Sequence, residues 1–368
     1  MRVHRNITLD WENMLSGIRA QAEWLRHGPA EALADARSAL GGPSPSHVYL
    51  VGCGDSHYAG LSTRLAFDRW SGAPTEALPS LEFARYVVAG APAGAWVVCV
   101  SNSGRVARTV EAAERARGRG LTTIAVTYEA ESPLGHAADT TLRYRYPDPG
   151  FGPGTVSYVA SMVMLYALAA RVGELAGRMN EKEAGERLEA VAAQSDVVDR
   201  TIEQSWPAAE KLGRETALDL PIHLIGGGPS FGTASFGRAK LIEAARVAAG
   251  AHELEEWAHE QFFCTGPGTV TIVVAPSGHS EDRAAEQLAA AREMGGTGVA
   301  VCPLGARPSA DTVLEVAGDP PEELSPLAYC VPLEIFALCF ARSKGLTMFG
   351  FDDERRKQVN FRQIFVRG

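Results

Sequence analysis

The residues best suited to chemistry lie in the segment Ser101-Asn102-Ser103-Gly104, which follows a continuous apolar run at 96–100. Helical spacing of Val106 and Val110 follows it. Backbone N–H groups and the positive end of the helix dipole favour an anion at such a strand-to-helix junction. The segment therefore predicts an anion site, most simply for phosphate. The alternative is that Ser101 only caps the helix and Ser103 only shapes the turn.

A second segment with the same character contains Gly54, Asp55 and Ser56, between an apolar run at 47–51 and a helical pattern that extends to 67. Both segments are predicted to follow strands of one doubly wound parallel sheet. Ligands collect at the carboxyl ends of the strands in such sheets. We therefore expect both segments to contribute to one site.

The composition restricts the classes of function. The chain has 368 residues, of which 46% are hydrophobic and 21% charged, as in a globular protein with two domains of ordinary size. Its net charge of −9, with no concentrated basic segment, argues against nucleic acid as a partner. The six cysteines are scattered without metal-site spacing and predict core residues in a reducing compartment. No signal-like or membrane-spanning run is evident, so we expect a cytoplasmic protein without a membrane partner.

The order of predicted elements indicates two similar α/β units. After a helical segment at 10–41, strands are predicted at 47–51, near 75, at 96–100 and at 122–127, with helices between them. An apolar helix at 155–173 and an amphipathic helix at 180–203 follow. The pattern then begins again, with strands at 221–225, 270–274, 298–302 and 312–316 and helices at 235–249, 280–294 and 325–344. Each unit is predicted to be a parallel sheet flanked by helices, a flavodoxin- or Rossmann-like three-layer sandwich.

Several segments together resemble the two-domain form of the sugar isomerase (SIS) domain family. They occur in the family's order and spacing, and they are 51–56, 101–104, 131–139, 159–161, 240–243 and 256–259. The isomerase half of glucosamine-6-phosphate synthase and the fructoselysine 6-phosphate deglycases are similar members, and the tail around Asp353 to Arg356 is similar to that of the deglycases. The resemblance implies a helical lead-in at 1–45, SIS domains at 46–200 and 201–345, and a tail at 346–368 that contributes to the site.

The resemblance also implies roles for particular residues. Ser101, Ser103 and the turn from Gly54 to Ser56 would hold a sugar phosphate. Glu243 would be the base in proton transfer and His259, sixteen residues later, the acid. Further candidates are Asn102 and Ser161 for substrate binding, and Lys240, Glu256 and Arg356 with less defined roles. The resemblance implies no metal and no cofactor, and it implies a homodimer, for which the apolar helix at 155–173 offers surplus apolar surface.

Simpler interpretations exist for the two implied catalytic residues. Glu243 lies among apolar neighbours, where burial would favour a working base, but it could instead pair with Lys240 or Arg246 on a helix surface. His259 could be a structural histidine in an aromatic cluster with Trp257, Phe262 and Phe263. Nearby glutamates also make a metal site conceivable, although no His-x-x-x-His spacing is present. The glycine-rich turn at 226–232 lacks a complete nucleotide-binding motif and is better explained by close backbone packing.

Departures from the family pattern shape the functional hypotheses. Val106 replaces a usual threonine, Asp55 places a negative charge where relatives have a hydroxyl, and Asn360 stands where the amino-sugar isomerase has a Schiff-base lysine. The main hypothesis is a deglycase or isomerase that acts on a fructosamine 6-phosphate or sugar phosphate by proton transfer between Glu243, His259 and the substrate. The alternatives are a non-catalytic regulator that binds a sugar phosphate, and an isomerase of a sugar derivative without phosphate.

Overall fold

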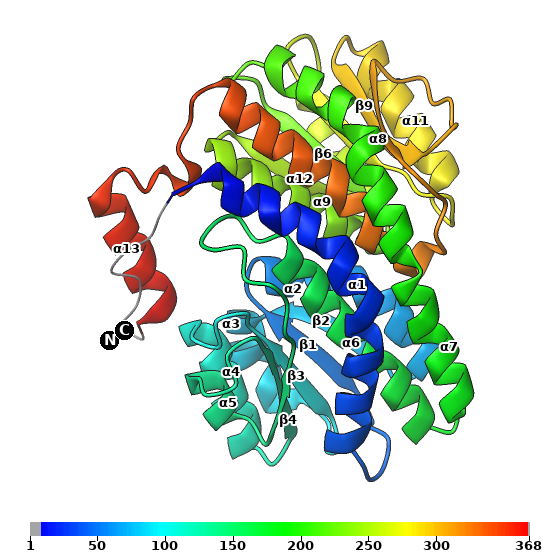
Figure 1. Ribbon diagram of the computed structural model, residues 1–368, viewed down its shortest axis with the longest axis vertical. Coiled ribbons are helices and arrows are strands. Elements are labelled where there is room, and N and C mark those ends of the chain that lie inside the picture. The colour runs from blue at the N-terminus through cyan, green and yellow to red at the C-terminus, as the bar shows by residue number, and fades with distance from the viewer. Residues whose placement is uncertain (1–8, 367–368) are drawn as a thin grey trace. The chain divides into compact units, whose positions relative to one another are not determined.

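The computed structural model describes residues 9–366 and contains two parallel five-stranded sheets flanked by helices (Figure 1). The predicted tandem α/β fold is thereby confirmed. The described chain divides into two compact units that are discontinuous in sequence. One unit comprises 23–146, 157–195 and 359–366 and holds the first sheet, and the other comprises 9–22, 147–156 and 196–358 and holds the second.

The first sheet has the strand order β2-β1-β3-β4-β5, and all neighbouring strands are parallel. Its strands are β1 (Val48–Gly52), β2 (Thr75–Pro79), β3 (Trp96–Val100), β4 (Thr122–Thr127) and β5 (Thr140–Arg143). The helices that connect them are α2 (Asp55–Ala66), α3 (Ser80–Glu82), α4 (Ala107–Gly118) and α5 (Pro133–Ala137). The chain adds strands to one side of β1 and then to the other, so the direction changes between β1 and β3.

Alternating side chains of β1 pack on opposite faces of the first sheet. Tyr49 and Val51 belong to a core cluster with Val110 of α4 and Leu134 of α5. The intervening Leu50 faces α2, where a Cβ at Gly60 would lie 3.2 Å from the Leu50 Cβ. Strands β1 and β3 are buried at every position, which explains their continuous apolar sequences.

The second sheet has the order β10-β9-β8-β6-β7 and repeats the topology of the first. Its strands are β6 (Ile222–Gly226), β7 (Ala249–Glu253), β8 (Val270–Val274), β9 (Thr297–Pro303) and β10 (Thr312–Val316). Its main helices are α9 (Pro229–Ala245), α10 (Leu254–His259), α11 (Glu281–Glu293) and α12 (Pro326–Ser343). The direction of strand addition changes between β6 and β8, the counterparts of β1 and β3.

The helices of the second unit divide between the two faces of its sheet. A Cβ at Gly237 of α9 would lie 2.5 Å from Leu333 of α12 and 2.9 Å from Leu224 of β6, and Figure 1 shows α9 and α12 side by side. The next residue of β6, Ile225, packs instead with Trp257 of α10 and Leu288 of α11. Because successive strand residues point to opposite faces, α10 and α11 cover the face opposite to α9 and α12.

The boundaries differ from the sequence-based prediction at several elements. The edge strands β5 and β7 were not predicted, because Ala249-Gly-Ala-His-Glu253 contains few of the residues that favour strands. Helix α9 begins at Pro229, six residues before the predicted start, since proline is favoured in the first helical turn. The helix predicted at 180–203 is two helices, α7 (Glu181–Ala192) and α8 (Gln194–Glu215).

Two further long helices are α1 (Trp11–Ala39) and α6 (Val156–Leu175). Helices α6 and α12 are long and apolar enough to cross a membrane, yet 89% of each apolar window is buried within the protein. Both therefore fit the core of a folded protein. The remaining helix is α13 (Glu354–Phe365), and short helical turns occupy Phe67–Ser71, Phe83–Val87, Val88–Gly90, Gln261–Cys264, Glu322–Leu324 and Met348–Gly350.

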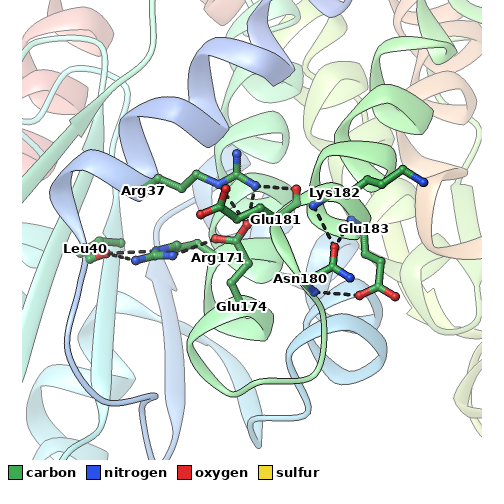
Figure 2. Close-up of polar contacts among 8 residues, drawn as sticks. All are labelled: Arg37, Leu40, Arg171, Glu174, Asn180, Glu181, Lys182 and Glu183. Carbon is green, nitrogen blue, oxygen red and sulfur yellow. Dashed lines mark hydrogen bonds and ion pairs between the residues drawn. The ribbon is translucent and has the colours of Figure 1, made fainter.

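A buried carboxylate fastens the end of α1 to α6 and α7 (Figure 2). Glu174 of α6, whose side chain is 5% exposed, accepts hydrogen bonds from Arg37 of α1 and from Arg171. Arg37 also donates to the carbonyl oxygen of Glu181, and Arg171 donates to that of Leu40. This network therefore joins three helices within the first unit.

Candidate functional site

The candidate site lies where the direction of strand addition changes in the first sheet. The loops after β1 and β3 leave the sheet at its carboxyl edge on neighbouring strands, with Val51 paired to Cys99. Connections diverge at this point, which leaves a crevice where ligands bind in doubly wound folds. Both segments that the sequence singled out are therefore adjacent, as expected.

The loop after β1 turns sharply into α2. A Cβ at Gly52 would lie 2.6 Å from the backbone carbonyl carbon of Ser56, so only glycine permits this approach. Gly54, the residue before the helix, is exposed and has a φ of +56°, and its carbonyl oxygen accepts from the N–H groups of His57 and Tyr58. Asp55 and Ser56 are half-buried in the first helical turn.

The loop after β3 places a buried hydroxyl at the same edge. Ser101 is 1% exposed, and its Oγ has no hydrogen-bond partner within residues 9–366. Helix α4 starts only at Ala107, after Val106 in the N-cap position, so the interpretation of Ser101 as a helix cap is wrong. A Cβ at Gly104 would lie 2.0 Å from the Ser132 Oγ, so only glycine allows the loop to pack this closely against Ser132. The Oγ of Ser103 accepts the N–H of Arg105 at 3.3 Å.

Asn102 is connected to two tyrosines and to Ser161. Its Oδ1 accepts from the hydroxyls of Tyr144 at 3.2 Å and Tyr146 at 2.9 Å. The Ser161 Oγ lies 3.3 Å from the Tyr144 hydroxyl and donates to the Ser157 carbonyl oxygen. Complete burial raises the pKa of Tyr144, so its hydroxyl keeps the proton that it donates. With Oδ1 occupied, the exposed Asn102 amide presents its two N–H donors away from the tyrosines.

His57 lies one residue beyond the predicted turn and is an additional site candidate. Burial lowers its pKa to about 4, so the imidazole is neutral at pH 7. Its Nδ1 is buried without a hydrogen-bond partner in the described part of the chain. A neutral imidazole with an unused nitrogen can accept or donate a hydrogen bond at a ligand hydroxyl.

The second sheet repeats the backbone of this edge but keeps only some of its polar groups. Gly226, Gly228 and Ser230 correspond to Gly52, Gly54 and Ser56, and Gly228 has a φ of +52°. A Cβ at Gly226 would lie 2.5 Å from the Ser230 carbonyl oxygen, which confirms the close packing expected there.

The loop after β8 closes on a carboxylate from its own chain. Ala275 and Pro276 stand in the positions of Ser101 and Asn102. The Glu322 carboxylate accepts from the backbone N–H of His279 at 3.3 Å and lies 2.5 Å from its Nδ1. This loop therefore offers no equivalent anion site.

Glu243 lies in the last turn of α9 and is paired with Lys240. The Lys240 Nζ is 2.5 Å from the Glu243 Oε2 and 4.9 Å from the centre of the Phe236 ring, and Lys240 is fully buried. This contact agrees with the simpler interpretation, in which Glu243 pairs with Lys240. The Glu243 side chain remains 28% exposed, so a ligand can still reach its carboxylate.

His259 ends α10 and is exposed. Its Nε2 lies 3.3 Å from Glu255, which also accepts from Arg283 at 2.7 Å. The hydrogen bond and charge of Arg283, followed by those of His259, lower the pKa of Glu255 despite slight burial. Glu256 is exposed, and its N–H donates to Glu253. Within residues 9–366 no three His, Cys, Asp or Glu side chains are grouped to hold a metal ion.

Glu243 and His259 belong to helices on opposite faces of the second sheet. Glu243 is on α9, on the face of Leu224, whereas His259 is on α10, on the face of Ile225. Helix α9 also runs from the carboxyl edge back to the amino edge, while α10 starts at the carboxyl edge after β7. Within one chain, the second sheet therefore lies between Glu243 and His259, the two residues that the resemblance implies as a catalytic pair.

The first unit also matches a known family by sequence. Residues 44–171 match the SIS domain family model. The first unit is therefore similar to a SIS domain. The matched residues include β1 to β5 and both loops of the candidate site, together with Asn102 and Ser161.

Curated relatives extend the similarity beyond the first unit. Glutamine–fructose-6-phosphate aminotransferase from Mycobacterium bovis is 28% identical over 306 residues, which are 81% of this chain and 48% of the relative. The corresponding protein from Clostridium tetani is 25% identical over 81% of this chain and 49% of the relative. The chain thus spans about half the length of the curated relatives it matches.

Solved structures show that the similarity in fold covers both units. The C-terminal domain of the aminotransferase from Francisella tularensis superposes with a TM-score of 0.80 at 17% identity, over 91% of this chain and 97% of that one. Tagatose-6-phosphate ketose/aldose isomerase from Escherichia coli gives 0.70 at 17% identity, over 92% and 94%. Glucosamine-6-phosphate deaminase from Thermotoga maritima gives 0.72 at 21% identity, over 91% and 96%.

Sequence reasoning missed three polar residues at the carboxyl edge of the first sheet, namely His57, Tyr144 and Tyr146. The signal for His57 was its place beside the Gly54 to Ser56 turn. The signal for the tyrosines was their alternation around Arg145 after an apolar position in β5. Because β5 itself was not predicted, nothing in the sequence placed these side chains beside Asn102.

Proposed function

We propose that the carboxyl edge of the first sheet binds the phosphate of a sugar phosphate. The observation that carries this proposal is the unsatisfied, buried Ser101 hydroxyl beside the outward-facing Asn102 amide. Both groups can donate hydrogen bonds to an anion at the crevice between β1 and β3. The names of the relatives and structural neighbours support the same chemistry, since they refer to 6-phosphates of fructose, glucosamine and tagatose.

The proposed reaction is a deglycation or isomerisation that moves a proton between adjacent sugar carbons. In a fructosamine 6-phosphate, the Glu243 carboxylate would take a proton from C1, which bears the amine, to give an enaminol. Return of the proton at C2 gives an imine, and addition of one water releases the free amine and an aldose phosphate. His259 would donate and recover protons at the ring or amine heteroatom. The asparagine at position 360 favours this route over a Schiff base on lysine.

This reaction requires two copies of the chain. Glu243 and His259 lie on opposite faces of one sheet, so His259 from a second copy would have to complete the site beside Glu243. The exposed His259 and the neighbouring Phe263, which is 79% exposed, form a surface available for such docking. We therefore propose a homodimer in which each copy supplies one member of the pair.

A second candidate is a regulator that binds a sugar phosphate without converting it. The separation of Glu243 and His259 within one chain, and their contacts with Lys240 and Glu255, favour it. A third is an isomerase of an unphosphorylated sugar, favoured by the carboxylate of Asp55 and the missing hydroxyl at Val106.

A matched ligand panel separates these candidates. Calorimetry with fructose 6-phosphate, glucosamine 6-phosphate and fructosamine 6-phosphates, each paired with its unphosphorylated form, measures the contribution of the phosphate. Chromatography of the same mixtures detects isomerised or deglycated products. Binding that needs phosphate, with turnover, supports the enzyme; binding without turnover supports the regulator. Equal binding of both forms contradicts a phosphate site.

A further inference from the structure

A pocket in the first unit is lined by arginine side chains and lies at the opposite end of α2 from the candidate site. Its volume is about 510 Å³, and Arg69, Arg178 and Arg187 contribute to its lining. All three arginines belong to the first unit. Helix α2 begins in the loop after β1 and ends at Ala66, shortly before Arg69. Its 12 residues span roughly 18 Å, so the pocket is separate from the candidate site.

The backbone after α2 leaves room for one of these arginines. A π-helical turn at Phe67–Ser71 contains Arg69 and Trp70, which both line the pocket. Such turns are rare and often occur at functional sites. The turn ends at Gly72, whose φ is +67°. A Cβ at Gly72 would lie 2.7 Å from the Cδ, Nε and Cζ atoms of Arg178, so only glycine lets this side chain pack here.

Two of the arginines that line the pocket keep unpaired charges in the described part of the chain. Arg178 and Arg187 are exposed, and neither guanidinium has a hydrogen-bond or ion-pair partner within residues 9–366. The Arg187 Cζ instead lies 5.7 Å from the centre of the Trp70 ring, in a cation–π contact. The pocket therefore presents two positive charges that an anion can offset.

The two acids that line the same pocket are held by other partners. Glu183 accepts the backbone N–H of Asn180 at 2.7 Å and so completes the capping box of α7 (Figure 2). The Glu186 Oε1 lies 3.1 Å from the Lys182 Nζ. Neither acid therefore neutralises the two unpaired arginines, although each carboxylate can accept a further hydrogen bond from a ligand.

Trp70 also lines the pocket and brings a buried hydrogen-bond donor to it. Its side chain is 3% exposed, and its Nε1 has no hydrogen-bond partner within the described residues. A buried donor without a partner costs free energy, and an acceptor on a ligand would remove this cost. Indole and guanidinium groups only donate hydrogen bonds, so their ligand must supply acceptor oxygens and negative charge. These donors therefore favour an oxyanion.

A phosphate monoester fits these groups in number and in charge. It has three terminal oxygens for the three donor groups, and about two negative charges at pH 7 for the two unpaired guanidinium groups. Planar guanidinium groups also match phosphate oxygens in bidentate geometry. The volume of about 510 Å³ is in the range of pockets for organic ligands, so a phosphate ion alone would leave most of it empty.

We propose that this pocket binds a phosphate monoester whose organic part carries hydroxyl groups. Arg178, Arg187 and the indole N–H of Trp70 hold the phosphate oxygens. The carboxylates of Glu183 and Glu186 accept hydrogen bonds from the hydroxyl groups. The pocket is distinct from the carboxyl edge of the first sheet, so the inference does not depend on the proposed function.

Calorimetry with three phosphate monoesters tests this inference. Glucose 6-phosphate, ribose 5-phosphate and AMP are compared with glucose, ribose and adenosine. The protein carries Ser101→Ala and Ser103→Ala, which weaken the site proposed at the carboxyl edge. We expect at least one phosphorylated probe to bind at least about tenfold more tightly than its unphosphorylated form, as charge-assisted hydrogen bonds contribute. Adding Arg178→Gln or Arg187→Gln should weaken its binding by about tenfold.

The matched control is Arg119→Gln, which removes the same charge from an exposed arginine of the same unit outside the pocket. Its affinity for the probe should equal that of the parent protein. Hydrogen exchange of the wild type locates the site without any substitution. The bound probe should slow exchange in residues 67–72 and 176–190, the segments that surround the pocket.

Failure of all three probes to bind overturns the inference. So does binding that Arg178→Gln and Arg187→Gln leave unchanged, or hydrogen exchange in 67–72 and 176–190 that no probe slows. Inorganic phosphate that binds as tightly as the best monoester would overturn the assignment of an organic ligand. The proposed function fails by a separate result, in which Ser101→Ala with Ser103→Ala leaves every wild-type affinity unchanged.

Discussion

The hydroxyl of Tyr146 lies 2.9 Å from the Oδ1 of Asn102 and fixes which end of the amide faces the crevice. Without this donor the amide can rotate and present an oxygen to an anion. We expect Tyr146→Phe to weaken sugar phosphate binding by about three- to tenfold, and Tyr144→Phe with Tyr146→Phe to weaken it further, in line with the loss of one or two hydrogen bonds. Calorimetry with the tightest ligand of the panel measures this.

Tyr128→Phe is the control for the tyrosine variants. The Tyr128 ring contacts that of Tyr146, with centroids 4.9 Å apart, but Asn102 accepts from Tyr144 and Tyr146. Loss of packing alone would affect Tyr128→Phe as well. Equal effects of Tyr128→Phe and Tyr146→Phe would show that the hydroxyl does not orient the amide.

The serines of the loop after β3 should contribute to binding of the phosphate. We expect Ser101→Ala with Ser103→Ala to raise the dissociation constant for a sugar phosphate by about ten- to a hundredfold, because hydrogen bonds to an anion are stronger than neutral ones. The unphosphorylated sugar should be much less affected. Ser277→Ala, at the position of Ser103 in the second unit, is the matched control and should bind normally. Unchanged affinity in the double variant would make the loop purely structural.

The proposed base and acid can be tested separately and by subunit mixing. Glu243→Gln keeps the size of the side chain but removes the base, so turnover should fall on the order of a hundredfold or more with binding nearly intact. His259→Asn should have a similar effect, and the double variant should lose far less than the product of the two. The pH–rate profile should rise as a carboxyl group deprotonates and fall as an imidazole loses its proton.

Mixing the two inactive variants tests the homodimer. If each copy supplies one residue, mixed dimers of Glu243→Gln and His259→Asn contain one intact pair. Activity should then return to about a quarter of that of the wild type after subunit exchange. A monomer in sedimentation at micromolar concentration would refute the shared site. So would a failure of the mixed variants to regain activity under conditions in which the wild type is active. Full activity of Glu243→Gln would redirect the search for the base to Glu255, Glu256 and Glu260.

The Glu174 cluster predicts an acid-dependent contribution to stability. Burial alone would raise the pKa of Glu174, but hydrogen bonds and charge from Arg37 and Arg171 outweigh it and lower the pKa. A lowered carboxyl pKa stabilises the fold above the unfolded value near 4.5, and this contribution is lost as the pH falls through the folded pKa. Glu174→Gln should lower the free energy of unfolding at pH 7 by about 3 kcal/mol.

Urea denaturation at pH 7 and at pH 3 checks this prediction. The difference between wild type and Glu174→Gln should shrink at the lower pH, because protonation removes the charge in the wild type. Glu186→Gln is the control, since its partner Lys182 is 84% exposed and an exposed pair contributes below about 1 kcal/mol. A difference that is the same at both pH values would mean that packing, not charge, makes Glu174 stabilising.

Much of the fold follows from local sequence. The strand Trp96–Val100 was predicted at its observed bounds, because five buried apolar residues leave few alternatives. The strand Ala249–Glu253 was not predicted, because its pairing with β6 determines its conformation more than its own residues do.

The site was predictable to the extent that it is local. The loops after β1 and β3 follow from strand ends and small polar residues, whereas the contact of Asn102 with Tyr146 joins residues 44 positions apart. The spacing of sixteen residues between Glu243 and His259 could not reveal that the intervening strand β7 separates them onto different faces of the sheet.

The two sheets share a sharp glycine turn after β1 and β6 but differ after β3 and β8, where one has Ser101 and Asn102 and the other is closed by Glu322. This combination fits the outcome of a gene duplication. After such an event, the glycines that permit the sharp turn remain under pressure from folding in both copies. Pressure from a ligand acts only on the copy that binds it. The second copy can then exchange serine and asparagine for alanine and proline and replace the lost anion with its own carboxylate. Comparison of the two halves thus distinguishes the residues that the backbone needs from those that a ligand needs.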